Sequence, residues 1–164
     1  MCLDSQSLYA ILQPRKDGFS WNWAFLLPGP EPTARLWHAT YDNPENTWQY
    51  KTREDEADKI LADRIVLAMR LADLTVLGTY PEVVDSIDAV LKQVPVVENP
   101  VQRDEFSSRV WFMNGVAALD EAGHIQCDSV NTLEKEIRNH ALLATEKYIY
   151  RIKEMTYITS EHCS

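Results

Sequence analysis

Three short segments of the chain contain side chains whose types and spacing suit acid–base or acyl-transfer chemistry. Asn22 and His38 lie in two runs that alternate as strands do, and Ser108 stands at the start of a run with helical spacing. An imidazole can act as a general base, and a serine at the first turn of a helix is close to N–H groups that stabilise a developing anion. We therefore predict that His38, Asn22 and Ser108 are the catalytic residues.

Two neighbouring strands and one helix must position these groups. Side chains alternate along a strand, so Asn22 and His38 can lie on one side of a hairpin formed by residues 19–27 and 35–41. The third segment begins a helix predicted over residues 107–122. This helix has a serine as its N-cap and Gly after its last turn.

Aromatic and polar residues near these positions are predicted to bind a substrate. The chain contains five Trp and seven Tyr, and such side chains fill cores as well as lining apolar ligand pockets. The predicted substrate-binding residues are Trp111, Trp48, Tyr50, Thr40 and Arg109. Trp23, Trp37 and Tyr41 have the opposite strand parity to Asn22 and His38, so we expect them in the core on the other face.

Each of these interpretations has a structural alternative. The pocket aromatics could equally fill the core, His38 could be a half-buried strand histidine, and Ser108 could be a helix cap, because serine is favoured there.

The three segments resemble permuted papain-like domains, which include lecithin:retinol acyltransferase, NlpC-like enzymes and a group of small fungal proteins. That family has a strand reading His-Trp-Ala-(apolar), a following strand with a second His, and a helix that begins Asn-Cys-x-x-Trp. The matching segments, within residues 8–123, are Trp23-Ala24-Phe25-Leu26, Trp37-His38-Ala39 and Ser108-Arg109-Val110-Trp111.

The departures from the family pattern suggest altered chemistry. Asn22 stands where the family has its first His, and Ser108 stands where it has its Cys. An amide is no general base near neutral pH, and a serine nucleophile needs a well-placed base. The resemblance therefore implies a repurposed enzyme of fungal specialised metabolism, which cyclises or isomerises an apolar small molecule without a covalent intermediate.

Two other functions are consistent with the same residues. In the first, Ser108, or a native Cys at that position, is the nucleophile of an acyltransferase or hydrolase and His38 is its base. In the second, the protein is a non-catalytic binding or scaffold protein.

The remaining periodicities predict a single α+β domain over residues 1–164, with a small antiparallel sheet packed by helices. Further strands are expected at 8–12, 47–52 and 65–71, and further helices at 54–61, 81–91 and 131–152. Asn131 is the expected N-cap of the last helix, with Glu134 as its capping-box partner.

Composition limits the partners and the compartment. A net charge of −9 without a basic cluster argues against nucleic acid, and no apolar run is long enough to span a membrane. No Gly-rich phosphate loop or metal-ligand spacing is present, so we expect no cofactor and no metal. Cys2, Cys127 and Cys163 are distant and odd in number, and no signal peptide is visible, which predicts a reduced, cytoplasmic protein. The long last helix makes a homodimer possible.

Overall fold

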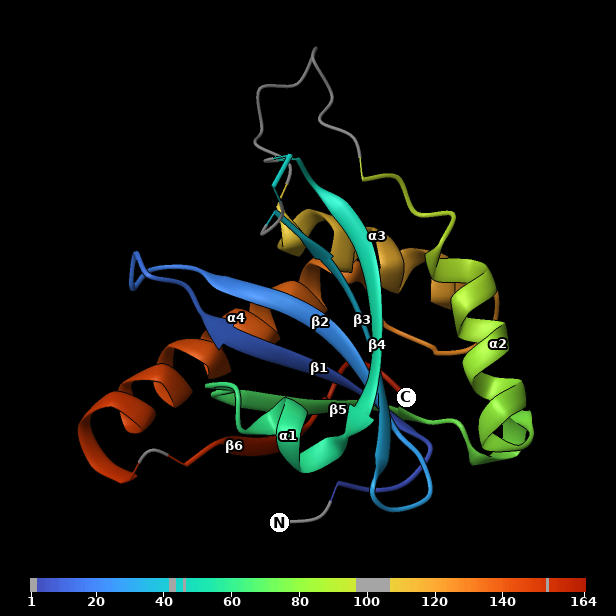
Figure 1. Cartoon of the computed structure of the whole chain (residues 1–164), viewed down its shortest axis with the longest axis horizontal. Helices are drawn as coiled ribbons and strands as arrows, with labels where there is room; N and C mark the ends of the chain where they lie inside the picture. The colour runs from blue at the N-terminus through green and yellow to red at the C-terminus, as the bar shows by residue number, and fades with distance from the viewer. Residues whose placement is uncertain (1–2, 42–43, 46, 97–106, 153) are drawn as a thin grey trace.

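The computed structural model describes residues 3–41, 44–45, 47–96, 107–152 and 154–164. Six strands form one sheet in the order β4-β3-β2-β1-β5-β6 (Figure 1), and every pair is antiparallel except β5 and β6. The strands are β1 (Ser7–Pro14), β2 (Trp21–Pro28), β3 (Thr33–Thr40), β4 (Gln49–Glu56), β5 (Leu67–Asp73) and β6 (Thr156–Thr159). The α+β class predicted from the sequence is confirmed.

Helices cover the two faces of the sheet unequally. Helices α2 (Tyr80–Leu91), α3 (Ser108–Glu121) and α4 (Val130–Lys147) pack on one face, and the short α1 (Ala57–Leu61) lies on the other (Figure 1). We call these the helix face and the α1 face. Trp23 and Trp37 belong to the large core on the helix face, as their parity predicts. Tyr41 is 46% exposed, so its expected place in that core is wrong.

Local sequence explains where the elements begin and end. The β1–β2 hairpin turns at Gly18, whose φ of +75° is one that glycine adopts without a steric cost. The Asp17 carboxylate accepts hydrogen bonds from the N–H groups of Phe19 and Ser20 in the same turn. Ser107 caps α3 by accepting from the Val110 N–H at 3.3 Å. These contacts fix the ends of the strands and the helix that carry the predicted site.

Two predicted helices begin differently in the structure. Residues 54–56 continue β4, because this strand stays paired with β3 until Glu56 lies opposite Thr33, so helix α1 begins only at Ala57. Ser129, rather than Asn131, caps α4 by accepting from the Thr132 N–H.

The end of the chain also differs from its prediction. Helix α4 ends at Lys147 and is followed by a π-helix over Tyr148–Ile152. Strand β6, which the sequence reading missed, then pairs in parallel with β5. The other predicted strands and helices are confirmed, with ends displaced by a few residues.

Cys127 and Cys163 form a disulfide, which corrects the expectation that all three cysteines are unpaired. The two residues are 36 positions apart but lie opposite each other in an isolated antiparallel bridge, flanked by hydrogen bonds between Gln126 and Ser164. The prediction of unpaired cysteines was wrong because it relied on their distance in the sequence, whereas the last segment folds back beside residue 127. The cytoplasmic compartment stays a prediction.

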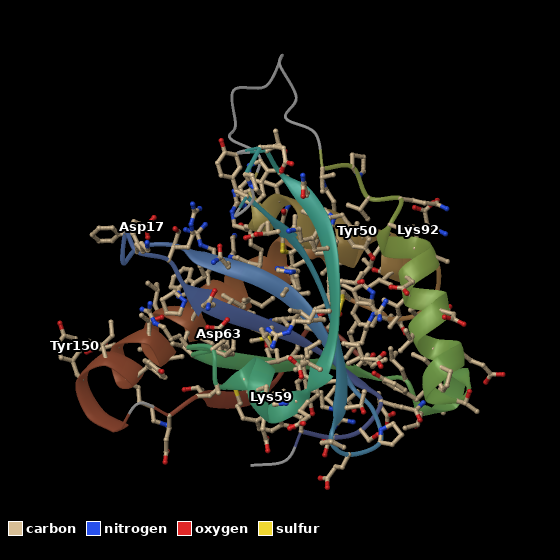
Figure 2. The ribbon with its side chains drawn as sticks, in the orientation of Figure 1. Asp17, Tyr50, Lys59, Asp63, Lys92 and Tyr150 are labelled. Carbon is tan, nitrogen blue, oxygen red and sulfur yellow. A yellow bond between two sulfur atoms is a disulfide. The ribbon has the colours of Figure 1, made fainter. Side chains whose placement is uncertain are left out.

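Part of the molecular surface is apolar. Leu142, Leu143, Ile149 and Tyr150 are each more than half exposed on α4 and the π-helix, and Figure 2 shows Tyr150 at one extremity of the molecule. The homodimer stays a prediction. Within the described ranges, no helix has the length and apolar content needed to cross a membrane.

Candidate functional site

Strands β2 and β3 bring Asn22 and His38 to the α1 face, as predicted. Ala24 lies directly opposite His38 in the β2–β3 register, and Asn22 shares the face of Ala24 because two residues separate them. His38 is half-buried and Asn22 is exposed. The two side chains therefore belong to one side of the sheet, at the end where the β2–β3 pairing stops.

A small pocket of about 120 Å³ contains both residues. Its polar lining combines Asn22 and His38 with Gln13 from β1, Arg53 from β4 and Asp63 from the turn after α1. Its remaining walls are Ile11, Trp23, Ala24, Leu36, Ile60 and Ile65. We call this the inner pocket; it can hold only a few atoms of a ligand.

A larger pocket of about 480 Å³ lies beside the inner pocket and shares Gln13 and Asn22 with it as walls. This outer pocket is also lined by Thr40, Tyr41 and Trp48, and the rings of Tyr41 and Trp48 are in contact at a centroid distance of 5.6 Å. Its remaining lining is Pro14, Arg15, Lys16, Asp17 and Arg64. The predicted residues Thr40 and Trp48 are thus placed with Asn22.

Hydrogen bonds tie the shared wall to the turn after α1. Asn22 Nδ2 donates to Gln13 Oε1 at 3.2 Å, and Gln13 Nε2 donates to the carbonyl of Asp63 at 2.7 Å. The two amide side chains therefore form a chain from β2 through β1 to the turn. Such a chain favours one orientation of the Asn22 side chain between the pockets.

The electrostatic surroundings keep His38 neutral. Burial is the main cause that lowers its pKa below the ordinary value of 6.5, and the positive charges of Lys51 and Arg53 lower that pKa further. Lys51 lies directly opposite His38 in the β3–β4 register. An imidazole that is neutral at pH 7 has a free ring nitrogen, which can accept a proton.

Ser108 approaches the sheet from the helix face. Its Oγ accepts a hydrogen bond from the backbone N–H of Trp23 at 3.1 Å, and the residue is 2% exposed. His38 instead has its side chain on the α1 face, and no hydrogen bond joins it to Ser108 in the described structure. The structure therefore brings together two of the three predicted catalytic residues and leaves Ser108 apart.

Three predicted substrate-binding residues also lie away from the pockets. Trp111 is fully buried in the helix-face core against Phe25, and the Tyr50 ring packs on it at a centroid distance of 5.8 Å. Burial raises the pKa of the Tyr50 hydroxyl to about 12. Arg109 forms an ion pair with Glu134 of α4 at 2.7 Å, which holds two helices together.

The sequence reading missed several residues of the pockets. Gln13 and Asp63 come from other elements, and only the sheet register and the position of α1 bring them to Asn22. It also missed a contact between Ser86 Oγ in α2 and His124 Nε2 after α3. Burial lowers the pKa of His124, and its buried Nδ1 has no partner to orient the ring, so this pair lacks the third group of a triad.

Within the described ranges, no group of three or more His, Cys, Asp or Glu side chains is placed to hold a metal ion. The chain matches no protein-family model, and no curated protein or solved structure is significantly similar to it. The resemblance to permuted papain-like domains therefore stays a prediction. The geometry of the two pockets is the basis for assigning a function.

Proposed function

We propose that the protein binds a small molecule across the two pockets on the α1 face and catalyses a non-covalent isomerisation by proton transfer, with His38 as the base. The observation that carries this proposal is the half-buried His38 side chain, placed with Asn22 and Arg53 in the inner pocket, where burial lowers its pKa. The bulk of the substrate occupies the outer pocket, because about 120 Å³ is too small for it.

The chemistry follows from the charges near His38. Its imidazole removes a proton from a carbon next to a carbonyl group, and the resulting enolate regains a proton at oxygen or at another carbon, so no atom is gained or lost. The cations that lower the pKa of His38 also stabilise the negative charge of the enolate. Asn22, held by Gln13, orients the substrate at the junction of the pockets.

The position of Ser108 supports a mechanism without an acyl intermediate. A serine nucleophile needs a base within hydrogen-bonding distance, whereas the Ser108 oxygen is bonded to a backbone N–H on the other side of the sheet. The predicted acyltransferase role of Ser108 thus has less support than the non-covalent reaction at His38.

Phenylpyruvate is a suitable probe, because it combines an acidic C–H bond, a carbonyl group and an aromatic ring. We expect the wild-type protein to accelerate exchange of its benzylic protons in deuterium oxide, as measured by proton NMR. His38→Gln should reduce this exchange to the buffer rate, a loss of at least about 100-fold for a general base.

His140→Gln is the matched control, because it removes a histidine from α4, on the other face of the sheet. The control should exchange at the wild-type rate. Wild-type exchange no faster than that of His38→Gln would contradict the proposal.

A further inference from the structure

The cations around the outer pocket differ from most others in the described structure. Elsewhere, six cations form ion pairs with described carboxylates (Arg35, Arg53, Lys59, Arg70, Arg109 and Arg138), and four do not (Lys51, Lys92, Lys135 and Lys147). Arg15, Lys16 and Arg64 form no ion pair with any described residue, although the chain has a net charge of −9. Three positive charges and a single negative charge, that of Asp17, therefore line one pocket of an acidic protein.

The one carboxylate in the lining is already bonded. Asp17 accepts hydrogen bonds from the Ser20 hydroxyl and from the N–H groups of Phe19 and Ser20, at 2.6 to 3.0 Å. These bonds lower the pKa of Asp17 and direct its carboxylate to the hairpin turn. Figure 2 shows Asp17 at the tip of this hairpin. The positive charge of Arg15 also lowers the pKa of Asp17, so this carboxylate offsets part of the positive charge of the lining.

The backbone holds Arg64 in a conformation that is unusual for a residue with a side chain. Its φ is +58°, in the left-handed region that favours glycine. The turn is fastened on both sides, since the Asp63 carbonyl accepts from Gln13 and the Val66 N–H donates to the Leu12 carbonyl. Strained residues held in this way often occur at ligand sites. Here Arg64 lines the same pocket as Arg15.

The aromatic part of the outer-pocket lining suits a planar group. The rings of Tyr41 and Trp48 are in contact there, and Tyr41 is 46% exposed at the pocket. Aromatic walls hold flat apolar groups, whereas arginine and lysine bind carboxylates and phosphates by charge-assisted hydrogen bonds.

We infer that the substrate is a small organic anion in which a carboxylate or phosphate monoester is joined to a planar ring. Arg15, Lys16 and Arg64 bind the anionic group, and the ring lies against Tyr41 and Trp48. This inference rests on the proposed function only in that the outer pocket receives the substrate. It changes the apolar substrate predicted from the sequence to an anionic one.

The test measures binding of phenylpyruvate, phenyl phosphate and the neutral phenylacetamide by isothermal titration calorimetry. We expect at least one anion to bind at least about tenfold more tightly than phenylacetamide, and to weaken in about 0.5 M NaCl, which screens exposed charges. If only phenylpyruvate binds tightly, the anionic group of the substrate is a carboxylate. If only phenyl phosphate does, that group is a phosphate.

The decisive variant is Arg15→Gln, Lys16→Gln and Arg64→Gln combined, and its matched control is Lys92→Gln, Lys135→Gln and Arg138→Gln. The control removes the same charge from exposed residues at the end of α2 and in α4, and Figure 2 shows Lys92 far from the hairpin. The pocket variant should bind the anion at least about tenfold more weakly and the control within about twofold. If circular dichroism shows that the pocket variant is unfolded, the single variant Lys16→Gln replaces it. This variant should bind the anion more weakly than wild type, whereas the folded control should not.

Equal weakening in both variants, or equal binding of phenylacetamide and the anions, would overturn the inference. The failure of the proposed function is distinguishable from this result. Anion binding that depends on the pocket cations, without deuterium exchange that depends on His38, leaves the inference standing and removes the catalytic role. Deuterium exchange that depends on His38, without a preference for anions, supports the catalytic role and overturns the inference of an anionic substrate.

Discussion

The Ser108 hydroxyl accepts a hydrogen bond from the backbone N–H of Trp23 at 3.1 Å, joining the first turn of α3 to β2. The register of β2 with β3 begins at Ala24 opposite His38, so Trp23 lies just beyond the paired region. Ser108 therefore supplies an acceptor at the point where the neighbouring strand no longer pairs. A buried N–H without an acceptor would be costly, which gives Ser108 a structural role.

Ser108→Ala should consequently destabilise the fold, and it removes no side chain that lines the pockets. Loss of the acceptor leaves a buried N–H unsatisfied, and we expect the free energy of unfolding to fall by about 1–3 kcal/mol in urea titrations. Phenylpyruvate exchange should remain at the wild-type rate when measured well below the unfolding transition.

A fluorophosphonate probe provides an independent check on serine chemistry. We expect no label at Ser108, because its oxygen is buried and has no adjacent base. Label at Ser108 that His38→Ala abolishes would establish the acyl-transfer alternative. Label at Ser86 would instead show that the contact with His124 activates that hydroxyl.

Gly115 allows α3 to pack closely on the sheet. A Cβ at this position would lie 2.8 Å from the ring of Phe25 and 3.1 Å from the side chain of Leu91. In an open helix, alanine would stabilise by about 1 kcal/mol relative to glycine, whereas overpacking a core costs about 1–3 kcal/mol. We therefore expect Gly115→Ala to lower the free energy of unfolding.

Ala117→Gly is the control for helix propensity, because Ala117 is exposed on the same helix. It should cost about 1 kcal/mol, the usual difference between the two residues in a helix. A Gly115→Ala protein more stable than wild type would show that α3 and Phe25 are not in close contact.

The sequence predicts those parts of the fold that depend on short-range periodicity. Alternation in β2 and β3 correctly places Asn22 and His38 on one face, and Trp23 and Trp37 on the other. These placements follow from side-chain geometry along a strand and need no knowledge of distant residues.

Which residues line the site depends on contacts between residues far apart in the sequence, and a single sequence does not reveal these contacts. Gln13 and Asp63 reach Asn22 only because β1 lies beside β2 and α1 returns across the sheet. Trp111 has the composition of a pocket residue, yet the close approach of α3 buries it against Phe25. The sheet also separates Ser108 from His38, although residue types alone predict that they act together.

The low pKa of His38 predicts a loss of stability in acid. Its pKa in the folded protein lies below the ordinary 6.5 of the unfolded chain, so the unfolded state takes up the proton first as the pH falls. The contribution of His38 to stability should therefore be fully present above pH 6.5 and decrease from there down to the pKa of the folded state. The measurement is the free energy of unfolding in urea at about pH 7.5 and about pH 5.5.

His38→Gln should lose less stability than wild type between these two pH values. His124→Gln should also reduce the acid loss, because burial lowers the pKa of His124 as well. An identical pH dependence in wild type and His38→Gln would contradict the burial of His38.

Reduction of the Cys127–Cys163 disulfide should destabilise the protein, because the bond closes a loop with a sequence separation of 36. Loop-closure entropy for this length corresponds to about 3–4 kcal/mol of the free energy of unfolding. Cys127→Ser combined with Cys163→Ser should reproduce the stability of reduced wild type, and a reductant should not affect that variant further.

The chain has three cysteines, so under denaturing conditions a thiol reagent should detect one free thiol before reduction and three afterwards. Three thiols before reduction would show that the pair is not oxidised, and the bridge beside residue 127 would then depend on its backbone hydrogen bonds alone.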